Sequence, residues 1–119
     1  MTLSASVDNF EGSVSTGADL VINKLIAKST SIKASSGSDV EIKTGKTDSF
    51  KANASSAADI DAEDFSAQTC SAMASSGADL ELHVVQSLKA KASSGGDINY
   101  KGSPTVDKKT TTGGDVSNK

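Results

Sequence analysis

Aromatic residues are scarce in this chain of 119 residues, which has three phenylalanines, one tyrosine and no tryptophan. A core with so few large side chains buries little apolar surface per residue, so hydrogen bonds between strands and stacked side chains must contribute more than usual. Few aromatics together with much Ser, Ala, Thr and Gly also occur in disordered chains. The strict repeat described below argues against disorder, because a disordered polar chain needs no fixed spacing.

Cysteine and histidine occur once each, as Cys70 and His83. A single cysteine cannot form an intramolecular disulfide, and one residue of each type excludes a zinc site built from Cys and His. Cys70 aligns with apolar positions of the repeat, so we expect a small buried hydrophobic residue. His83 follows an inward position, so we expect it on the surface rather than in a hydrolase triad. The sequence predicts no catalytic, cofactor-binding or metal-binding residue.

The chain also has no long apolar run and no strong excess of positive or negative charge. The longest apolar run is 20–22, which is far too short to span a membrane, and the first ten residues lack the charged and apolar regions of a signal peptide. The net charge is −3, and no basic stripe interleaved with aromatics is present, so we expect no nucleic-acid partner.

Six copies of one nine-residue pattern span nearly the whole chain, and they share an aspartate. The copies are VSTGADLVI (14–22), ASSGSDVEI (34–42), ASSAADIDA (54–62), ASSGADLEL (74–82), ASSGGDINY (92–100) and TTTGGDVSN (110–118). Their aspartates are Asp19, Asp39, Asp59, Asp79, Asp97 and Asp115, at spacings of 20, 20, 20, 18 and 18. A repeat of this period over the whole chain predicts stacked structural units in a single domain, 1–119.

Apolar and polar residues alternate on both sides of each aspartate. The residue after it is always aliphatic, and the next one is polar in five of six copies. The positions nine, seven and five residues before it are mostly apolar or small, as in Phe50, Ala52 and Ala54. This period of two predicts strands with one buried face. A short third strand is expected around the positions six residues after the aspartate, which are Leu25, Gly45, Phe65, Val85 and Ser103.

The Ser-Ser-Gly-x-Asp segment predicts a turn at the same place in every copy. Glycine adopts positive φ without steric cost, and Ser and Asp side chains bond to nearby backbone amides. The glycines are Gly17, Gly37, Gly77, Gly95 and Gly113. Ala57 replaces glycine in the third copy, where it requires a negative φ or bears strain. With turns in register, equivalent strands stack, so we predict an all-β fold: a right-handed parallel β-helix (β-solenoid) of about six 18–20-residue coils.

The glycines and aspartates of these turns are interpreted as a structural turn ladder, in which each aspartate accepts backbone amides of its own turn. A line of cation sites is the alternative, because hard cations prefer oxygen ligands. The segment GGDIN (95–99) partly matches the calcium-binding GGxGxD nonapeptide, but the period of the repeat differs. Asp61, Glu63 and Asp64 form a tight acidic cluster, which we expect to be a solvated edge of one coil.

The last quarter of the chain resembles the head GIN domain family of auto-transporter adhesins, which is common in Bacteroidetes. Its repeated Ser-Gly-x-x-aliphatic turns are similar to all six copies, and its Tyr-x-Gly-x-Pro-x-Val stretch matches Tyr100, Gly102, Pro104 and Val106. The resemblance implies a right-handed β-helical fold and an extracytoplasmic setting at the cell envelope or surface. It implies no catalytic residue, and members of the family are generally longer.

The expected function is therefore a non-enzymatic envelope or surface module of the adhesin type, with a cell-surface glycan or protein as ligand and without cofactor. A purely structural or cation-stabilised spacer domain remains the alternative; a carbohydrate-active β-helix enzyme and an ice-binding solenoid remain further ones. Residues 3–14 already alternate without a charged cap, so we expect this end to be a cut through a longer solenoid or a self-association edge. The last coil carries polar residues such as Lys108 and Asn118 at inward positions, which is typical of a capped end.

Overall fold

Parallel β-strands form all the regular structure that the computed structural model describes, which covers residues 2–111 and 113–118. The strands are β1 (Thr2–Val14), β2 (Asp19–Ala34), β3 (Asp39–Ile42), β4 (Gly45–Ala54), β5 (Asp59–Ala74), β6 (Asp79–Ala92), β7 (Asp97–Lys101), β8 (Thr105–Thr110) and β9 (Asp115–Asn118). Every pairing between them is parallel. The predicted all-β solenoid with about six stacked coils is therefore confirmed.

Each coil has three sides, and the longest strands run round all of them. In β2, buried and outward residues alternate except at 23–24 and 28–29, where two exposed residues are adjacent. The same interruption recurs in β5 at 63–64 and 68–69. Two successive outward residues turn the strand through a corner, which keeps both flanking segments facing one core. The short third strand expected near Leu25 is thus the middle side of the coil, at 25–27, and is continuous with its neighbours.

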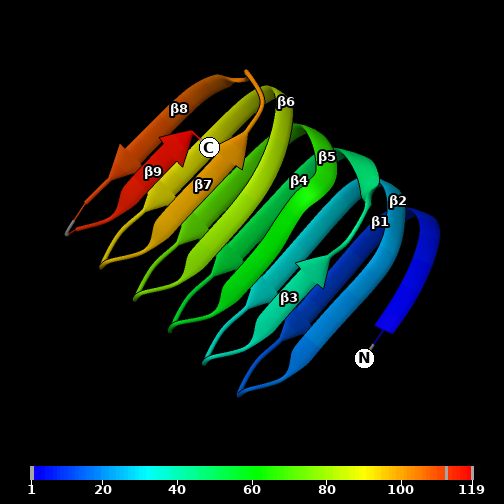
Figure 1. Cartoon of the computed structure of the whole chain (residues 1–119), viewed down its shortest axis with the longest axis horizontal. Coiled ribbons are helices and arrows are strands. Elements are labelled where there is room, and N and C mark those ends of the chain that lie inside the picture. The colour runs from blue at the N-terminus through cyan, green and yellow to red at the C-terminus, as the bar shows by residue number, and fades with distance from the viewer. Residues whose placement is uncertain (1, 112, 119) are drawn as a thin grey trace.

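The coils stack so that equivalent residues of the repeat lie side by side. Asp39 pairs with Asp19 and Asp59, and Ala54 pairs with Ala34 and Ala74. In Figure 1 the tight turns line up along one edge, and the colour runs from blue to red from one end of the stack to the other. In the strand segments on either side of the turns the register is constant, so each position of the repeat there becomes a straight row along the axis.

Inward rows build the core as the alternation predicted. The aliphatic residue after each aspartate is buried in all six coils, from Leu20 to Val116, with at most 6% of its surface exposed. Small residues fill the narrow end beside the turn, for example Ala54, Ala58 and Ala74. Ser38 takes one of these positions. Its hydroxyl donates to Ser35 O at 2.7 Å, so this buried polar group is satisfied.

Two of the five positions around which the third strand was expected are exposed, because the fourth and fifth coils are shorter. Val85 is 45% exposed and Val84 is fully buried instead, and Ser103 is exposed. The register shows where the shortening falls: Ala62 pairs with Leu82, but Ser66 already pairs with His83. Leu82 therefore occupies the corner that Ala62 to Phe65 span in the preceding coil, and the alternation after it shifts by one residue.

The two ends of the stack differ. In the described chain β1 pairs only with β2, so its outer edge is uncovered. At the opposite end, Asn118 Nδ2 donates to Gly102 O at 3.1 Å, so the polar residue at an inward position ties the last coil to the one before. No helix of the described residues is long and apolar enough to cross a membrane.

Candidate functional site

In the first five copies of the repeat, the tight turn is built from two consecutive residues with positive φ. In the second copy these are Ser36 (56°) and Gly37 (76°), and the Ser38 amide donates to Ser35 O at 3.2 Å. This is the geometry of a type I′ turn. The positive φ predicted for the glycines is confirmed, but nothing in the repeat predicts that the preceding Ser or Thr also has a positive φ. Ala57 has φ of 67°, so of the two options predicted for it the strained one applies.

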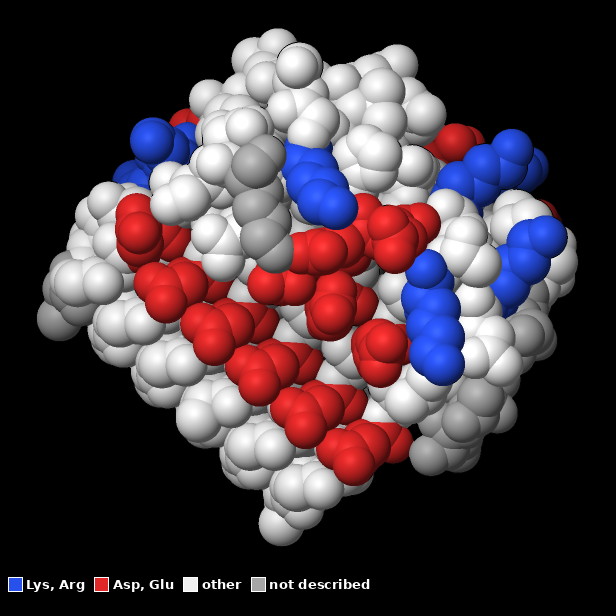
Figure 2. Space-filling model, in the orientation of Figure 1, with Lys and Arg blue, Asp and Glu red and all other residues white. Residues whose placement is uncertain are grey.

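The six aspartates form one continuous row beside these turns. Register pairs connect them in chain order from Asp19 to Asp115, and the carboxylates lie at or near the surface. Figure 2 shows the row crossing the molecule as a diagonal red band. The amides of Gly37, Ser38 and Asp39 donate to main-chain carbonyls of their own turn or of adjacent coils. Main-chain carbonyls therefore satisfy the amides of this turn, and acceptance of turn amides by the aspartates of the row stays a prediction.

Stacked carboxylates raise the pKa of members of the row. Partial burial raises the pKa of Asp59, and the charges of Asp79 and Asp39 raise it further. The pKa of Asp97 is raised by burial and then by Asp79 and Asp115. Each of these groups thus holds its proton more tightly than in an unfolded chain, since a proton relieves repulsion along the row.

A second acidic row lies next to the first and was not predicted. Glu41, Asp61 and Glu81 are in register two residues after the aspartates. The two rows together make the acidic face, which we define as Asp19, Asp39, Asp59, Asp79, Asp97, Asp115, Glu41, Asp61 and Glu81. The signal was available, because these residues occupy one outward position of the aligned copies. The alternation of apolar and polar residues predicts only that this position is polar.

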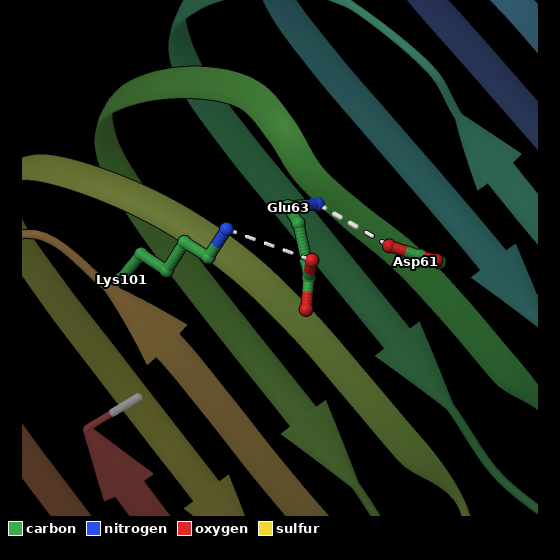
Figure 3. A network of polar contacts seen from close by, with 3 residues as sticks. All are labelled: Asp61, Glu63 and Lys101. Carbon is green, nitrogen blue, oxygen red and sulfur yellow. Dashed lines mark hydrogen bonds and ion pairs between the residues drawn. The ribbon is translucent and has the colours of Figure 1, made fainter.

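Three carboxylates of this region converge at one point. Oxygens of Asp61, Glu63 and Glu81 lie within 4.8 Å of one another, a donor set that suits a hard cation. Lys101 Nζ lies 3.6 Å from Glu63 Oε2, and the Glu63 amide donates to Asp61 Oδ1 at 3.4 Å, as Figure 3 shows. The cluster differs from the predicted one because Glu81 of the next coil replaces Asp64. The ammonium group of Lys101 already neutralises part of its charge.

Neither Cys70 nor His83 forms a nucleophilic centre. Cys70 lies in a row with Phe50 and Leu88 and is 5% exposed, and burial raises its pKa to about 12, so its burial is confirmed. A thiol with this pKa stays protonated and unreactive at neutral pH. His83 is partly exposed, and its Nδ1 lies 3.4 Å from Ser66 Oγ. Within the described residues no carboxylate bonds to this imidazole, so the pair lacks the third member that orients the histidine in a hydrolase triad.

A lysine-rich face covers another side of the coils and was not predicted either. Its outward residues form rows in the strand segments that lead into the turns. One row runs Glu11, Ser31, Lys51, Ser71, Lys89 and Asp107. The next runs Ser13, Lys33, Asn53, Met73, Lys91 and Lys109. We call these two rows the lysine face. These outward residues alternate with the inward positions that lie nine, seven and five residues before each aspartate.

Fold and surface together define a parallel β-solenoid domain with rows of like side chains and without an assembled catalytic centre among the described residues. The family model described as "Putative auto-transporter adhesin, head GIN domain" matches residues 1–104, so the chain belongs to this family. The match includes Tyr100, Gly102 and Pro104 of the predicted motif but ends before Val106. The resemblance seen in the last quarter thus holds for the chain up to 104.

Solved structures share the fold. A putative adhesin from Parabacteroides merdae has a TM-score of 0.91 at 21% identity, over 98% of this chain and 48% of its own. A putative adhesin from Parabacteroides distasonis gives 0.90 at 24% identity, over 98% and 49%. A putative lipid binding protein from the same species gives 0.74 at 21% identity, over 100% and 53%. This chain therefore spans about half the length of these structures. No curated protein sequence matches it.

Proposed function

We propose that this domain is a non-enzymatic binding module of the cell envelope that acts as an adhesin through a side face of the solenoid. The observation that carries the proposal is the constant register, which holds outward side chains in straight rows over the length of the stack. A surface of this kind binds an extended or repetitive partner by many equal contacts. Membership in a family described as adhesins supports a binding role.

Binding rather than catalysis is favoured by the state of the reactive groups. The Cys70 thiol is buried, and the Ser66–His83 pair has no carboxylate partner among the described residues. The converging carboxylates of Asp61, Glu63 and Glu81 lie on an outer face where Lys101 neutralises one of them. A glycosidase needs a protonated acid and a second carboxylate on either side of a bound sugar, whereas these three carboxylates converge at one point.

An extracytoplasmic position follows from the same proposal, since an adhesin meets its ligand outside the cell. The partner is a cell-surface glycan or protein. The uncovered edge of β1 is a second contact surface, because unpaired strand edges accept another strand. We propose that this edge pairs with a further coil or with a second copy.

Attachment of coated beads tests the proposed function. Beads carrying the domain through a C-terminal tag are washed over surfaces of purified matrix proteins, mucins and polysaccharides, beside beads that carry an unrelated β-solenoid. Retention on at least one surface, without release of sugars or peptides, is expected. Equal retention of the two bead types on every surface, or ligand cleavage by the domain, would overturn the proposal.

A further inference from the structure

We propose that the lysine face binds a single extended chain of an anionic polysaccharide, which lies along the solenoid axis in a groove between the two rows. This proposal rests on the proposed function and names the ligand class and the residues that contact it. The shape of the face, its charge and its spacing support this ligand class.

The groove consists of two shallow hollows that lie end to end. One lies over the first coils and is lined by outward residues that include Lys33, Lys51 and Asn53. The other has a volume of about 350 Å³ and is lined by residues that include Ser71, Met73, Lys89, Lys91 and Lys109. The hollows adjoin because Lys51 pairs with Ser71, and Asn53 pairs with Met73. Both are bounded by the same two rows, so together they follow the axis of the stack.

The charge of the groove is positive although the chain as a whole has a net charge of −3. Five exposed lysines line it: Lys33, Lys51, Lys89, Lys91 and Lys109. In the described part of the chain none of them has an ion-pair partner within 4.0 Å. The acidic residues of the two rows, Glu11 and Asp107, lie in the first and the last coil. An anionic chain along the groove therefore meets only lysines and neutral residues in the four coils between them.

The spacing of the groove suits a polysaccharide. Adjacent strands of a sheet lie about 4.8 Å apart, which is close to the length of one sugar unit in an extended chain. Successive sugars can therefore make equivalent contacts on successive coils. Met73 is 47% exposed at the centre of the groove and offers an apolar contact to the face of a pyranose ring. A parallel row of hydroxyls, Ser29, Ser49, Thr69, Ser87 and Thr105, flanks the groove and can bond to sugar hydroxyls.

Two other anionic partners fit the face less well. Single-stranded nucleic acid is held by aromatic side chains that stack on the bases, and neither row contains an aromatic residue. A membrane surface requires a broader apolar contact than Met73 supplies. We therefore use both as competing ligands in the test.

Binding of polygalacturonate, a chain of carboxylated sugars, tests the proposal by isothermal titration calorimetry at low salt. Dextran serves as the neutral polysaccharide, and a sulfated dextran shows whether carboxylates or sulfates are preferred. We expect binding of at least one anionic polysaccharide, no binding of dextran, and weakening with added NaCl. The double variant Lys89→Gln/Lys91→Gln should weaken binding by about tenfold, because it removes two adjacent exposed charge contacts.

The matched control is Lys24→Gln/Lys28→Gln, which removes the same charge from exposed residues outside the groove. It should bind like the parent, and thermal unfolding of both variants should match the parent. Equal weakening by the two double variants would show attraction by net charge alone and overturn the proposal. So would the absence of polyanion binding, or tighter binding of single-stranded DNA or of anionic phosphatidylglycerol vesicles.

Bead attachment separates this proposal from the proposed function. If domain-coated beads attach to a surface, but soluble polygalacturonate does not compete and Lys89→Gln/Lys91→Gln attaches normally, the lysine groove is not the ligand site and the adhesin function stands. If the beads attach nowhere, while polygalacturonate binds in solution and only Lys89→Gln/Lys91→Gln weakens that binding, the groove is confirmed and the adhesin function fails.

Discussion

Phe50 and Phe65 meet edge to face inside the third coil and its neighbour, with ring centroids 5.3 Å apart and ring planes at 84°. Phe50 comes from the strand segment that leads into a turn, and Phe65 comes from the short middle side of the next coil. Both are buried, with exposed fractions of 2% and 0%. The pair joins two sides of the solenoid at its middle, and no other described residue pair forms such an aromatic contact.

Truncating Phe65 should destabilise the domain strongly. The surrounding core is rich in alanine and cannot collapse into the space, so Phe65→Ala should lower the free energy of unfolding by about 3–5 kcal/mol. Phe65→Leu fills more of the volume and should cost less. Urea denaturation followed by circular dichroism measures both. A loss below about 1 kcal/mol for Phe65→Ala would show that the coil can close around the gap.

The position of Phe65 shows what the sequence predicts well. The inward rows follow from a period of two held in register over six copies, so aligning the aspartates located nearly every core residue. The alignment failed where the fourth coil loses residues. A fixed offset of six centres the third strand on Val85, whereas the chain lacks residues at the corner beside Leu82 and buries Val84 instead. The spacing of the aspartates shows how many residues the fourth coil lacks, but it does not show at which corner of the coil they are missing.

The surface was harder to predict for a different reason. Acidic and lysine rows become visible only when the outward positions of all coils are placed side by side, as they are for Glu41, Asp61 and Glu81. The convergence of Glu81 with Glu63 also needs the corner geometry, which periodicity does not specify. The positive φ of Ser36 depends on the turn type, and glycine alone is compatible with several types.

Replacing Ala57 by glycine should stabilise the protein. Ala57 has a φ of 67°, and the other five copies of the repeat have glycine at this position. Alanine in this left-handed region of φ costs about 1–2 kcal/mol. Glycine has more freedom in the unfolded chain, so the net gain should be about 0.5–1 kcal/mol. Chemical denaturation of Ala57→Gly against the parent measures it.

The reverse change at Gly77 is the control. A Cβ added there meets no heavy atom within 4 Å, so Gly77→Ala tests the backbone alone. It should destabilise by an amount similar to the gain at Ala57. If both substitutions leave the midpoint of unfolding unchanged, the turn adapts its φ values and bears no strain at Ala57.

Cys70 should resist thiol reagents until the protein unfolds. It is 5% exposed, and burial raises its pKa to about 12, so at pH 8 it is both protonated and shielded. We expect labelling by Ellman's reagent to be slow without denaturant and complete in urea. A cysteine at exposed position 73, as Met73→Cys in a Cys70→Ala background, should react at once. Equally fast reaction of the parent would contradict the burial of Cys70.

The aspartate row should make stability fall as pH rises through the acid range. The pKa of Asp59 and that of Asp97 are raised above the ordinary value of 3.8 in the folded protein. At a pH between the ordinary and the raised pKa, the folded state binds more protons than the unfolded state, so protonation favours folding. This contribution is fully present below the ordinary value and is lost once the pH exceeds the raised values. Other groups also change with pH, so the parent alone does not isolate the effect.

Asp59→Asn isolates it, because asparagine keeps the shape of a protonated carboxyl group and removes the repulsion by Asp39 and Asp79. We expect the variant to unfold at a higher temperature than the parent at pH 7 and low salt, with the difference shrinking as the pH falls below 3.8 or as NaCl screens the row. Asp48→Asn removes the same charge outside both acidic rows and serves as the control. If Asp59→Asn lowers the unfolding temperature at pH 7 while Asp48→Asn does not, the Asp59 carboxylate holds the turn by a favourable contact, and the row stabilises the coil stack as charged groups.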